Sequence, residues 1–453
     1  MGHRGQRSFR HGIHPPEHKD ETKGLAIRQF PFAPVLVVPL SQHIGKPAVP
    51  VVREGQEVVR GQRIARADGF MSVSMHAPAS GRVRRIGLVP GARGQMVPGI
   101  YIEPFPGSTQ EVMEGRPCRV DEAEPAEILA AIQDAGIVGL GGAAFPTHVK
   151  LSVPEGKRID TVVINGVECE PWLTTDHRVM LEQHDDIFMG LRYLLRLTGA
   201  ERAIIGVEAN KLDAVEHLRA RLPGDLPVSV EVLAVKYPQG AEKMLITALL
   251  GREVPSGGLP LDVGVVVINV ATTAEIGRLL PHGAGIQERV ITITGPAIRD
   301  RGNYRIPIGT PLRFLLDTVG LRPDVSRVFL GGPMMGTAVA SLDVPITKGT
   351  SGVTAFTVAE TGPITSAPEY PCIRCGYCLD ACPLFLNPAE LGLLARNGAY
   401  ERMAEERHLM DCFECGSCTY VCPAHIPLVQ RFRVAKLAVR RIAADRKARG
   451  GEA

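Results

Sequence analysis

The 453-residue sequence lacks any apolar run near the roughly 18 residues that a membrane-spanning helix needs. Its most apolar stretches, such as residues 263–270, have the length of strands. A net charge of only +3 argues against the strong positive field that favours nucleic acid. Aromatic residues are few, at 5%, but 45% of the chain is hydrophobic, which is an ordinary balance for several soluble domains.

Cysteine is nearly absent outside two short segments near the C-terminus. Eight of the ten cysteines lie in those segments, and only Cys118 and Cys169 lie elsewhere. No secretory signal is apparent at the start of the chain, so we expect a reducing compartment. In such a compartment clustered thiols serve as metal ligands, and disulfides are not expected.

Both cysteine segments, residues 372–383 and 412–423, have the pattern C-x2-C-x2-C-x3-C-P. This spacing is typical of [4Fe–4S] ligation in two-cluster ferredoxins, in which the fourth cysteine of each run binds the other cluster. A structural zinc site usually has paired C-x2-C knuckles separated by a longer loop, without a third cysteine at the same step. The sequence therefore predicts two clusters, with ligands Cys372, Cys375, Cys378 and Cys422 for one and Cys412, Cys415, Cys418 and Cys382 for the other.

The N-terminal part of the chain contains short alternating strands separated by glycine turns, most clearly over residues 49–83. Such a pattern predicts a small all-β unit. The segment resembles the barrel-sandwich fold of lipoyl and biotinyl carriers, which modify a lysine at a hairpin tip. The corresponding tip, residues 69–75, contains no lysine, so we expect a structural role.

In the central part of the chain, four strand-like runs alternate with helical patterns, at residues 161–165, 203–207, 230–235 and 263–270. This alternation predicts a largely parallel sheet covered by helices. Ligands of such sheets bind where the strands end and the helices begin. Polar or glycine-rich loops at those positions are therefore candidate binding sites.

Two loops have this character. The first carries Gly139, Gly141 and Gly142, whose closely spaced backbone amides can approach a phosphate or a flat ring, and Lys150 can neutralise the phosphate. An ordinary tight turn explains these glycines about as well. The second loop, residues 165–171, carries acids suited to ribose hydroxyls or flavin edge atoms, although a solvated turn is an open alternative.

These loops carry a resemblance to a known family. Residues 139–150 are similar to the glycine-rich FMN loop of the NADH-binding subunit of respiratory complex I. Residues 165–171 match that family's Asn-x-x-Glu-x-Glu-Pro segment, and residues 237–243 and 269–272 fall where it has later nucleotide contacts. Together with an N-terminal His-Gly-Ile-His-Pro and the two cysteine segments, nearly the whole chain resembles the RnfC family of the Rnf electron-transport complex.

The resemblance implies a cofactor site in the central region. The residues that it assigns to FMN are Gly139, Gly141, Gly142, Lys150, Asn165 and Glu168, and those around FMN or NADH are Glu170, Glu242 and Asn269. Two positions depart from the complex I pattern. Val167 replaces an aspartate, which removes a hydrogen-bonding group at the flavin, and Ala241 replaces the first acid of a Gly-Glu-Glu sequence.

We thus expect a multidomain α/β chain of four units. Their predicted bounds are 1–115 for a β barrel-sandwich hybrid, 116–285 for a Rossmann-like flavin/NADH domain, 286–360 for a β-grasp (soluble-ligand-binding) module and 361–453 for an α-helical ferredoxin domain. A helix is expected from about residue 428 to 449. It carries eight basic residues against one acid, so it suits anionic lipid or an acidic partner, or equally packs on its own domain.

The family resemblance implies a peripheral redox subunit on the cytoplasmic face of the plasma (inner) membrane. It would relay electrons between NAD(H), FMN and two [4Fe–4S] clusters to the membrane subunits of an ion-translocating NAD(H):ferredoxin oxidoreductase. The subunit itself would meet ferredoxin only indirectly. Hydride transfer itself needs no acid–base residue of the protein, and the activity belongs to the complex. Two alternatives stay open: a cobalamin reductase of a microcompartment, and a cluster-bearing docking subunit without nucleotide binding.

Overall fold

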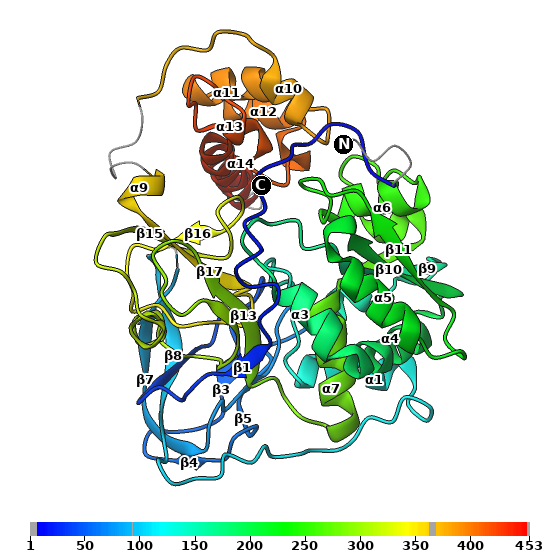
Figure 1. Ribbon diagram of the computed structural model, residues 1–453, viewed down its shortest axis with the longest axis vertical. Coiled ribbons are helices and arrows are strands. Elements are labelled where there is room, and N and C mark those ends of the chain that lie inside the picture. The colour runs from blue at the N-terminus through cyan, green and yellow to red at the C-terminus, as the bar shows by residue number, and fades with distance from the viewer. Residues whose placement is uncertain (1–6, 93, 362–367, 451–453) are drawn as a thin grey trace.

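The computed structural model describes residues 7–92, 94–361 and 368–450 and arranges them as four sheets with flanking helices and a separate helical unit (Figure 1). The mixed α/β, multidomain architecture expected from the sequence is confirmed. The boundary predicted at residue 361 adjoins residues 362–367, which lie outside the described part of the chain.

The central sheet is parallel and has the strand order β11-β10-β9-β12. Strands β9, β10 and β12 are almost wholly buried, as is typical of a sheet covered by helices on both faces, and the edge strand β11 is partly buried. The four strands coincide with the four predicted runs: β9 (Thr161–Gly166), β10 (Arg202–Glu208), β11 (Val228–Leu233) and β12 (Val265–Asn269). The helices of this region are α1 (Pro125–Asp134), α2 (Thr147–Leu151), α3 (Thr175–Glu182), α4 (His184–Thr198), α5 (Leu212–Arg221), α6 (Glu242–Leu250) and α7 (Val270–Leu279).

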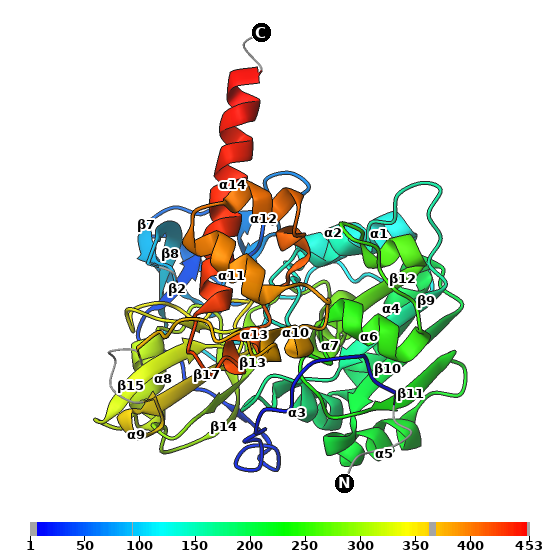
Figure 2. The same cartoon turned by 90° about the horizontal axis from the view of Figure 1, so that it is seen from above.

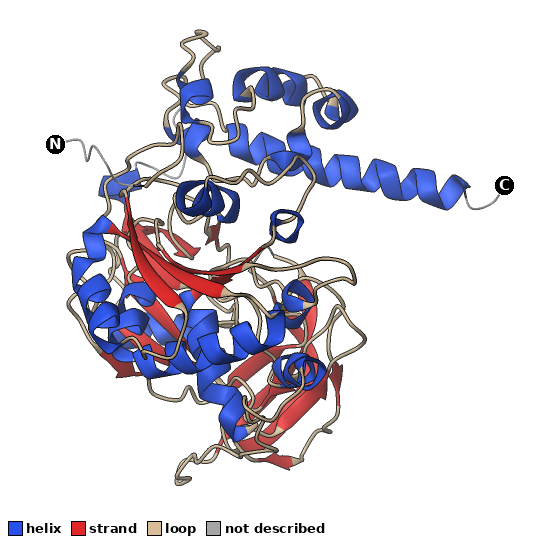
Figure 3. Cartoon of the chain, turned by 90° about the vertical axis from the view of Figure 1, so that its right-hand side faces the viewer, coloured by secondary structure: helices blue, strands red, loops and turns tan. Residues whose placement is uncertain are grey.

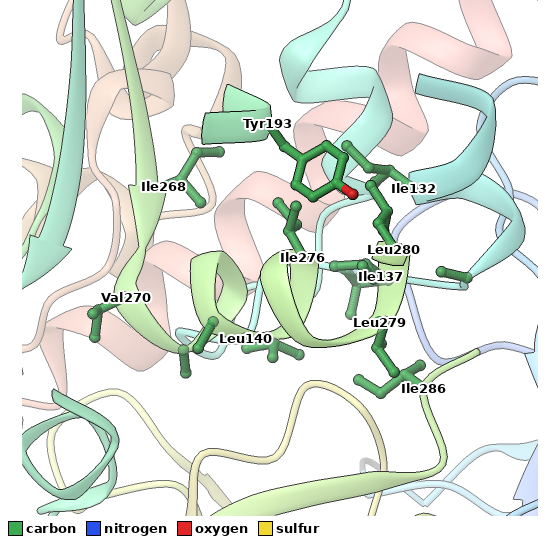
Figure 4. Close-up of a cluster of buried hydrophobic side chains, with 14 of the residues drawn as sticks. Ile132, Ile137, Leu140, Tyr193, Ile268, Val270, Ile276, Leu279, Leu280 and Ile286 are labelled. Carbon is green, nitrogen blue, oxygen red and sulfur yellow. The ribbon is translucent and has the colours of Figure 1, made fainter. Parts of the chain in front are cut away.

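Close packing of α4 against α7 fixes the helix that follows β12. A Cβ added to Gly190 on α4 would lie 2.0 Å from the carbonyl oxygen of Thr273, and one on Gly277 of α7 would lie 1.9 Å from that of Asp186. The two glycines thus allow backbone contact between the helices. Beside them, Tyr193 packs with Ile276 in a buried apolar cluster (Figure 4), which holds α7 firmly against the sheet.

The N-terminal barrel contains two small antiparallel sheets. Their strands are β2 (Leu36–Pro39), β8 (Met96–Pro104), β7 (Gly81–Pro90) and β4 (Glu57–Val58) in one, and β3 (Val49–Pro50), β5 (Arg63–Arg66) and β6 (Met75–His76) in the other. The lysine-free tip at residues 69–75 docks on the central domain. The Nε2 atom of His148 on α2 lies 2.7 Å from the carbonyl oxygen of Phe70, and Gln133 Nε2 donates to that of Ser72 at 2.9 Å. The tip therefore supports the helices on either side of the glycine-rich loop.

The first residues of the described chain belong to neither of those small sheets. Strand β1 (Ile27–Gln29) pairs in parallel with β14 of the largest sheet, and Ile13 exchanges two backbone hydrogen bonds with Tyr237 at 2.8 and 2.9 Å. Figure 1 shows this segment crossing between the helical unit and the central domain. Such long-range pairing leaves no local periodicity in the sequence, which is why the N-terminal prediction did not include it.

The largest sheet has six strands in the order β1-β14-β13-β17-β15-β16 and packs against α8 (Leu312–Val319). It lies where the sequence predicted a β-rich module. Its remaining elements are β13 (Glu288–Thr294), β14 (Gly302–Pro307), β15 (Val325–Leu330), β16 (Thr337–Ala338), β17 (Gly352–Thr357) and α9 (Val358–Thr361).

The helical unit contains both cysteine segments. Its helices are α10 (Tyr377–Ala381), α11 (Pro388–Arg396), α12 (Tyr400–Glu405), α13 (Ser417–Tyr420) and α14 (Leu428–Gly450). The sequence around residue 388 predicts a helix start, with Asn387 able to cap, Pro388 at the first helical position and Glu390 at the third. Helix α11 begins there, and the Asn387 side chain accepts the backbone N–H of Glu390 at 3.1 Å. The core of the helical unit is small and formed largely by α11, α12 and the first half of α14.

Helix α14 has two halves of different character. Phe432 and Ala435 in the first half are buried, and Arg433 pairs with Glu414 at 3.0 Å. The second half projects well beyond the rest of the protein (Figures 2 and 3), and residues 443–447 are exposed. The helix therefore packs on its own unit at one end and leaves basic side chains exposed at the other, where Arg446 pairs with Glu401. Among the described helices, none combines the length and apolar character needed to cross a membrane.

Candidate functional site

The strand order of the central sheet reverses between β9 and β12. The chain runs from β9 to β10 and β11 on one side and then returns to place β12 on the other side of β9. Open α/β sheets bind ligands at such a switch in strand order. Asn165 and Asn269, two predicted site residues, are register partners at the carboxyl edge of the sheet, so their Cα atoms are neighbours.

The glycine-rich loop lies over the start of α7 at this edge. The backbone N–H of Leu140 donates to Thr272 Oγ1 at 2.9 Å, and a Cβ added to Gly141 would lie 3.4 Å from the Asn269 side chain. Gly142 is exposed, has a φ of +106°, and faces open space. An exposed glycine backbone near the N-terminus of a ten-residue helix is suited to a phosphate or a flat ring, so the residues present fit FMN.

A group of acidic and amide side chains lies beside this loop. Glu168 accepts the backbone N–H groups of Asp176 and His177 at 2.8 and 3.3 Å, at the start of α3. Asn269 Nδ2 in turn donates to Asp176 Oδ2 at 2.7 Å, while Asn269 Oδ1 accepts the N–H of Thr272 at 3.2 Å. The structure therefore joins two predicted residues, Glu168 and Asn269, through Asp176.

Asp176 was not predicted from the sequence. Burial, and then the nearby Glu168 carboxylate, raise the pKa of Asp176 to about 7 from an ordinary 3.8. A carboxyl group with a strongly perturbed pKa is a common mark of a functional site. The available signal was its place in the first turn of the helix that follows the β9 loop, where a side chain faces the carboxyl edge of the sheet.

The raised pKa predicts a pH dependence of stability. Between pH 4 and 7 the folded chain keeps a proton on Asp176 that the unfolded chain has lost, so the free energy of unfolding falls as pH rises through this window. Asp176→Asn removes the charge and keeps an oxygen for Asn269. We expect the free energy of unfolding of the variant, relative to that of the parent, to rise by about 2 kcal/mol between pH 5.5 and 8. Melting temperatures of both proteins at the two pH values test this. The same difference in melting temperature at both pH values would contradict it.

The remaining predicted polar residues of the central domain form contacts of their own. Lys150 Nζ pairs with Glu242 at the start of α6, and both side chains are about one-third exposed, at 32% and 35%. Asn165 Nδ2 donates to the carbonyl oxygen of Gly240 at 2.8 Å. These contacts link α2, β9 and the β11–α6 loop, and the Lys150 side chain stays partly exposed while its ammonium is paired with Glu242.

Glu170 is engaged differently from the other predicted residues. Its carboxylate accepts the backbone N–H groups of Met334 and Met335, at 2.7 and 3.2 Å, in the glycine loop of residues 331–336. Burial raises the pKa of Glu170 in spite of these hydrogen bonds. The Lys19 ammonium also donates to the backbone carbonyl oxygen of Glu170, at 2.8 Å. The structure thus uses Glu170 to join the β9 loop to the large sheet, and the 331–336 loop packs against a neighbouring domain.

The two departures from the complex I pattern have structural roles. Val167 is fully buried in an apolar cluster under the sheet edge, and Ala241 precedes the first residue of α6. Neither offers a polar group. The adjacent Cys169 is also packed, with its sulfur accepting the N–H of Gly240 at 3.3 Å, and burial strongly raises its thiol pKa.

The eight motif cysteines line two separate cavities in the helical unit. The first is lined by Cys372, Cys375, Cys378 and Cys422, and the second by Cys382, Cys412, Cys415 and Cys418. Each set takes three cysteines from one segment and one from the other. Within the described residues no three His, Cys, Asp or Glu side chains converge on a single metal ion. Four cysteines around a cavity, separated in this way, fit a cluster of several irons.

The pKa shifts of the thiols reflect the same grouping. Burial raises the pKa of Cys378, and the thiols of Cys375, Cys372 and Cys422 add to the effect. The pKa of Cys418 is raised by burial, then by Cys415, Cys412 and Cys382, and also by Cys378 of the other set. The two cavities are therefore neighbours. We call them the outer cavity, which contains Cys372, and the inner cavity, which contains Cys418.

The inner cavity adjoins the central domain. The hydroxyl of Tyr237, which precedes α6, donates to the carbonyl oxygen of Cys415 at 2.6 Å. A small buried cluster around Tyr237 includes Ile13 and Ala381, with Cys169 and Met334 packed against it. A Cβ added to Gly416 would lie 3.1 Å from the carbonyl oxygen of Met334. The inner cysteine set is thus fixed to the β9 loop, the β11–α6 loop and the large sheet.

A further cavity of about 900 Å³ lies elsewhere, between the barrel, α1 and the segment around residues 113–119. Its lining includes Arg63, His76 and Cys118 but none of the predicted site residues. We assign it no part in the candidate site.

Comparison with known families matches three parts of the chain. Residues 7–105 match the RnfC barrel sandwich hybrid domain, residues 132–278 the Nuo51 FMN-binding domain, and residues 370–426 a 4Fe-4S dicluster domain. The FMN-binding match contains the glycine-rich loop and strands β9 and β12. The dicluster match contains both cysteine segments.

Full-length relatives are also similar. The chain is 42% identical to the C subunit of the proton-translocating ferredoxin:NAD(+) oxidoreductase complex of Clostridium ljungdahlii, over 95% of this chain and 93% of that protein. It is 41% identical to the Na(+)-translocating counterpart of Acetobacterium woodii, over 97% and 98%. A structure of air-oxidised NAD+-reducing [NiFe]-hydrogenase has a TM-score of 0.48 at 18% identity, covering 93% of this chain and 88% of its own.

Proposed function

Because the chain belongs to the RnfC family of ion-translocating ferredoxin:NAD(+) oxidoreductase complexes, we propose that it is the peripheral redox subunit of such a complex. It exchanges electrons with NAD(H) at the central domain and passes them through two cysteine-held clusters to membrane-bound partners on the cytoplasmic side. The observation that carries the proposal is the contact of Tyr237 with Cys415, which joins the β11–α6 loop of the central domain to the inner cavity.

The FMN site comprises the glycine loop and the residues around it. Backbone amides of Gly141 and Gly142 would approach the flavin or its phosphate, with the α7 N-terminus adding a favourable dipole. Gly139, whose N–H donates to the carbonyl oxygen of Phe145 at 2.8 Å, would close the loop beside them. Lys150 supplies the positive charge, and Asn165, Glu168 and Asn269 provide polar contacts at the sheet edge. Glu242 orients Lys150, with which it is paired.

When bound, the flavin supplies the conversion between the two-electron chemistry of a nicotinamide and the one-electron chemistry of a cluster. The protein's own task is positioning. The packed α4–α7 contact holds the helix under the glycine loop, and Glu170 holds the β9 loop against residues 331–336. Tyr237 and Lys436 donate to the carbonyl oxygens of Cys415 and Cys412, which fixes the inner cysteine set against the same region.

The structure supports the division of labour between the two cysteine sets. Outer ligands Cys372, Cys375, Cys378 and Cys422 hold the cluster nearer the surface, and inner ligands Cys382, Cys412, Cys415 and Cys418 hold the one nearer the central domain. For the domains we keep the bounds proposed from the sequence. The exception is the N-terminal segment, which crosses between the flavin and cluster units.

An assay of the purified full-length chain under anaerobic conditions tests the function. We expect NADH to drive the reduction of a one-electron dye, benzyl viologen, with FMN and iron present in the protein. Rapid NADH-dependent reduction of hydroxocobalamin in place of the dye would favour a cobalamin reductase. Intact clusters with no NADH-dependent reduction of either acceptor would leave a docking subunit without nucleotide binding and contradict the proposal.

A further inference from the structure

The outer and inner cysteine sets differ in their access to the surface. Cys382 and Cys418 of the inner set are only 9% and 8% exposed, whereas Cys372 and Cys375 of the outer set are exposed. The inner set is covered by the central domain through Tyr237. The outer set therefore opens to the outside of the described chain.

Large apolar side chains gather around the outer cavity. Tyr370, Ile373 and Leu393 line it and are 54%, 68% and 60% exposed. Ile373 lies between the first two cysteines of the motif, and Leu393 lies on α11. Grouped apolar side chains on a soluble surface mark an interaction site, while scattered ones do not.

The rim of the outer cavity is also positively charged. Arg374 and Arg396 are exposed and line the cavity, and within the described residues neither has an ion-pair partner. A third lining arginine, Arg431, is neutralised by Glu369. Two free guanidinium groups thus flank the exposed cysteines. We call Tyr370, Ile373, Arg374, Leu393 and Arg396 the outer-cluster surface.

Resting on the proposed function, we propose that the outer-cluster surface docks an acidic iron–sulfur carrier protein or domain. The apolar side chains exclude water at the contact, and the two arginines attract acidic groups around the carrier's own cluster. Exposed cysteine ligands at the centre favour a redox protein over a lipid surface, because a lipid exchanges no electrons. One electron leaves the carrier's reduced cluster and enters the oxidised outer cluster, or the reverse, and no bond or proton changes place.

The test measures how fast a carrier reduces the full-length, cluster-loaded chain. The probe is an acidic two-[4Fe–4S] ferredoxin, reduced beforehand and mixed by stopped flow at low and high salt. We compare the parent, Arg374→Glu/Arg396→Glu, and a matched control, Arg53→Glu/Arg84→Glu, whose exposed arginines lie on the barrel and also lack an ion pair among the described residues. We expect the outer-surface variant to react about tenfold more slowly at low salt, with the difference vanishing at high salt, and the control to match the parent.

Each other outcome has a distinct meaning. Equal rates for the parent and the outer-surface variant, or equal slowing of the control, would overturn the proposal. The proposal would also be overturned if the outer-surface variant lost binding to phosphatidylglycerol vesicles but kept the parental ferredoxin rate, because that result assigns the surface to lipid. Reduced methyl viologen should react equally with all three proteins. The parent and control could react rapidly with ferredoxin, and the outer-surface variant slowly, while NADH reduces none of the three proteins. That result would contradict the proposed function and leave the docking surface supported.

Discussion

Cys382→Ala is expected to remove the inner cluster, although Cys382 belongs to the first cysteine segment. The structure groups Cys382 with three cysteines of the second segment around the inner cavity. The iron content should fall from about eight to about four per chain, since each cluster holds four irons. The outer cluster should keep its electron paramagnetic resonance signal when reduced by dithionite, but NADH should no longer reduce it, because the inner cluster lies between it and the central domain.

The reciprocal variant Cys422→Ala provides the matching test, since it should remove the outer cluster alone and leave NADH able to reduce the inner one. Cys118→Ala serves as the control, because Cys118 lies in neither cysteine set and should leave all the iron in place. If Cys382→Ala instead lost the signal of the cluster held by Cys372, Cys375 and Cys378, the crossed ligand assignment would be wrong.

Gly142→Leu is expected to leave the chain folded but free of FMN. Gly142 is exposed, has a positive φ, and faces open space in front of the glycine loop, where a leucine side chain would fill the volume that the flavin needs. The positive φ adds a strain of about 1–2 kcal/mol. We expect the flavin content, measured from the absorbance released on denaturation, to fall by more than about tenfold.

Gly156→Leu controls for strain in the same domain. Gly156 is also exposed, has a φ of +83°, and has no neighbouring heavy atom within 4 Å of an added Cβ, but it lies in a turn before β9 away from the predicted site. Its variant should lose similar stability and keep its flavin. Equal flavin loss in both variants would mean that strain, and not the site, explains the Gly142 result.

Local patterns predicted much of the fold. The four parallel strands follow from apolar runs of strand length, and the cap of α11 follows from Asn387, Pro388 and Glu390 at fixed offsets. The grouping of the cysteines around two cavities agrees with the spacing rule for two-cluster ferredoxins. In each case the residues that determine the local structure are close together in the sequence.

Contacts between distant segments could not be predicted in this way. The pairing of β1 with β14, the hydrogen bond from Tyr237 to Cys415, and the capture of two backbone N–H groups by Glu170 each join segments more than 150 residues apart. Asp176 was missed because its burial and its neighbour Asn269 depend on how α3 meets β12. These contacts place the cluster unit beside the sheet edge, and so they determine how the separate motifs act together.

The most direct test of the account is an anaerobic NADH titration of the cofactor-loaded chain, followed by visible absorbance, with Gly142→Leu alongside. For the parent, the account predicts bleaching of the flavin and of the cluster absorbance. In the flavin-free variant NADH should bleach nothing, while dithionite still reduces both clusters. Cluster bleaching by NADH at the parental rate without flavin, or no bleaching in a parent that contains flavin and clusters, would contradict it.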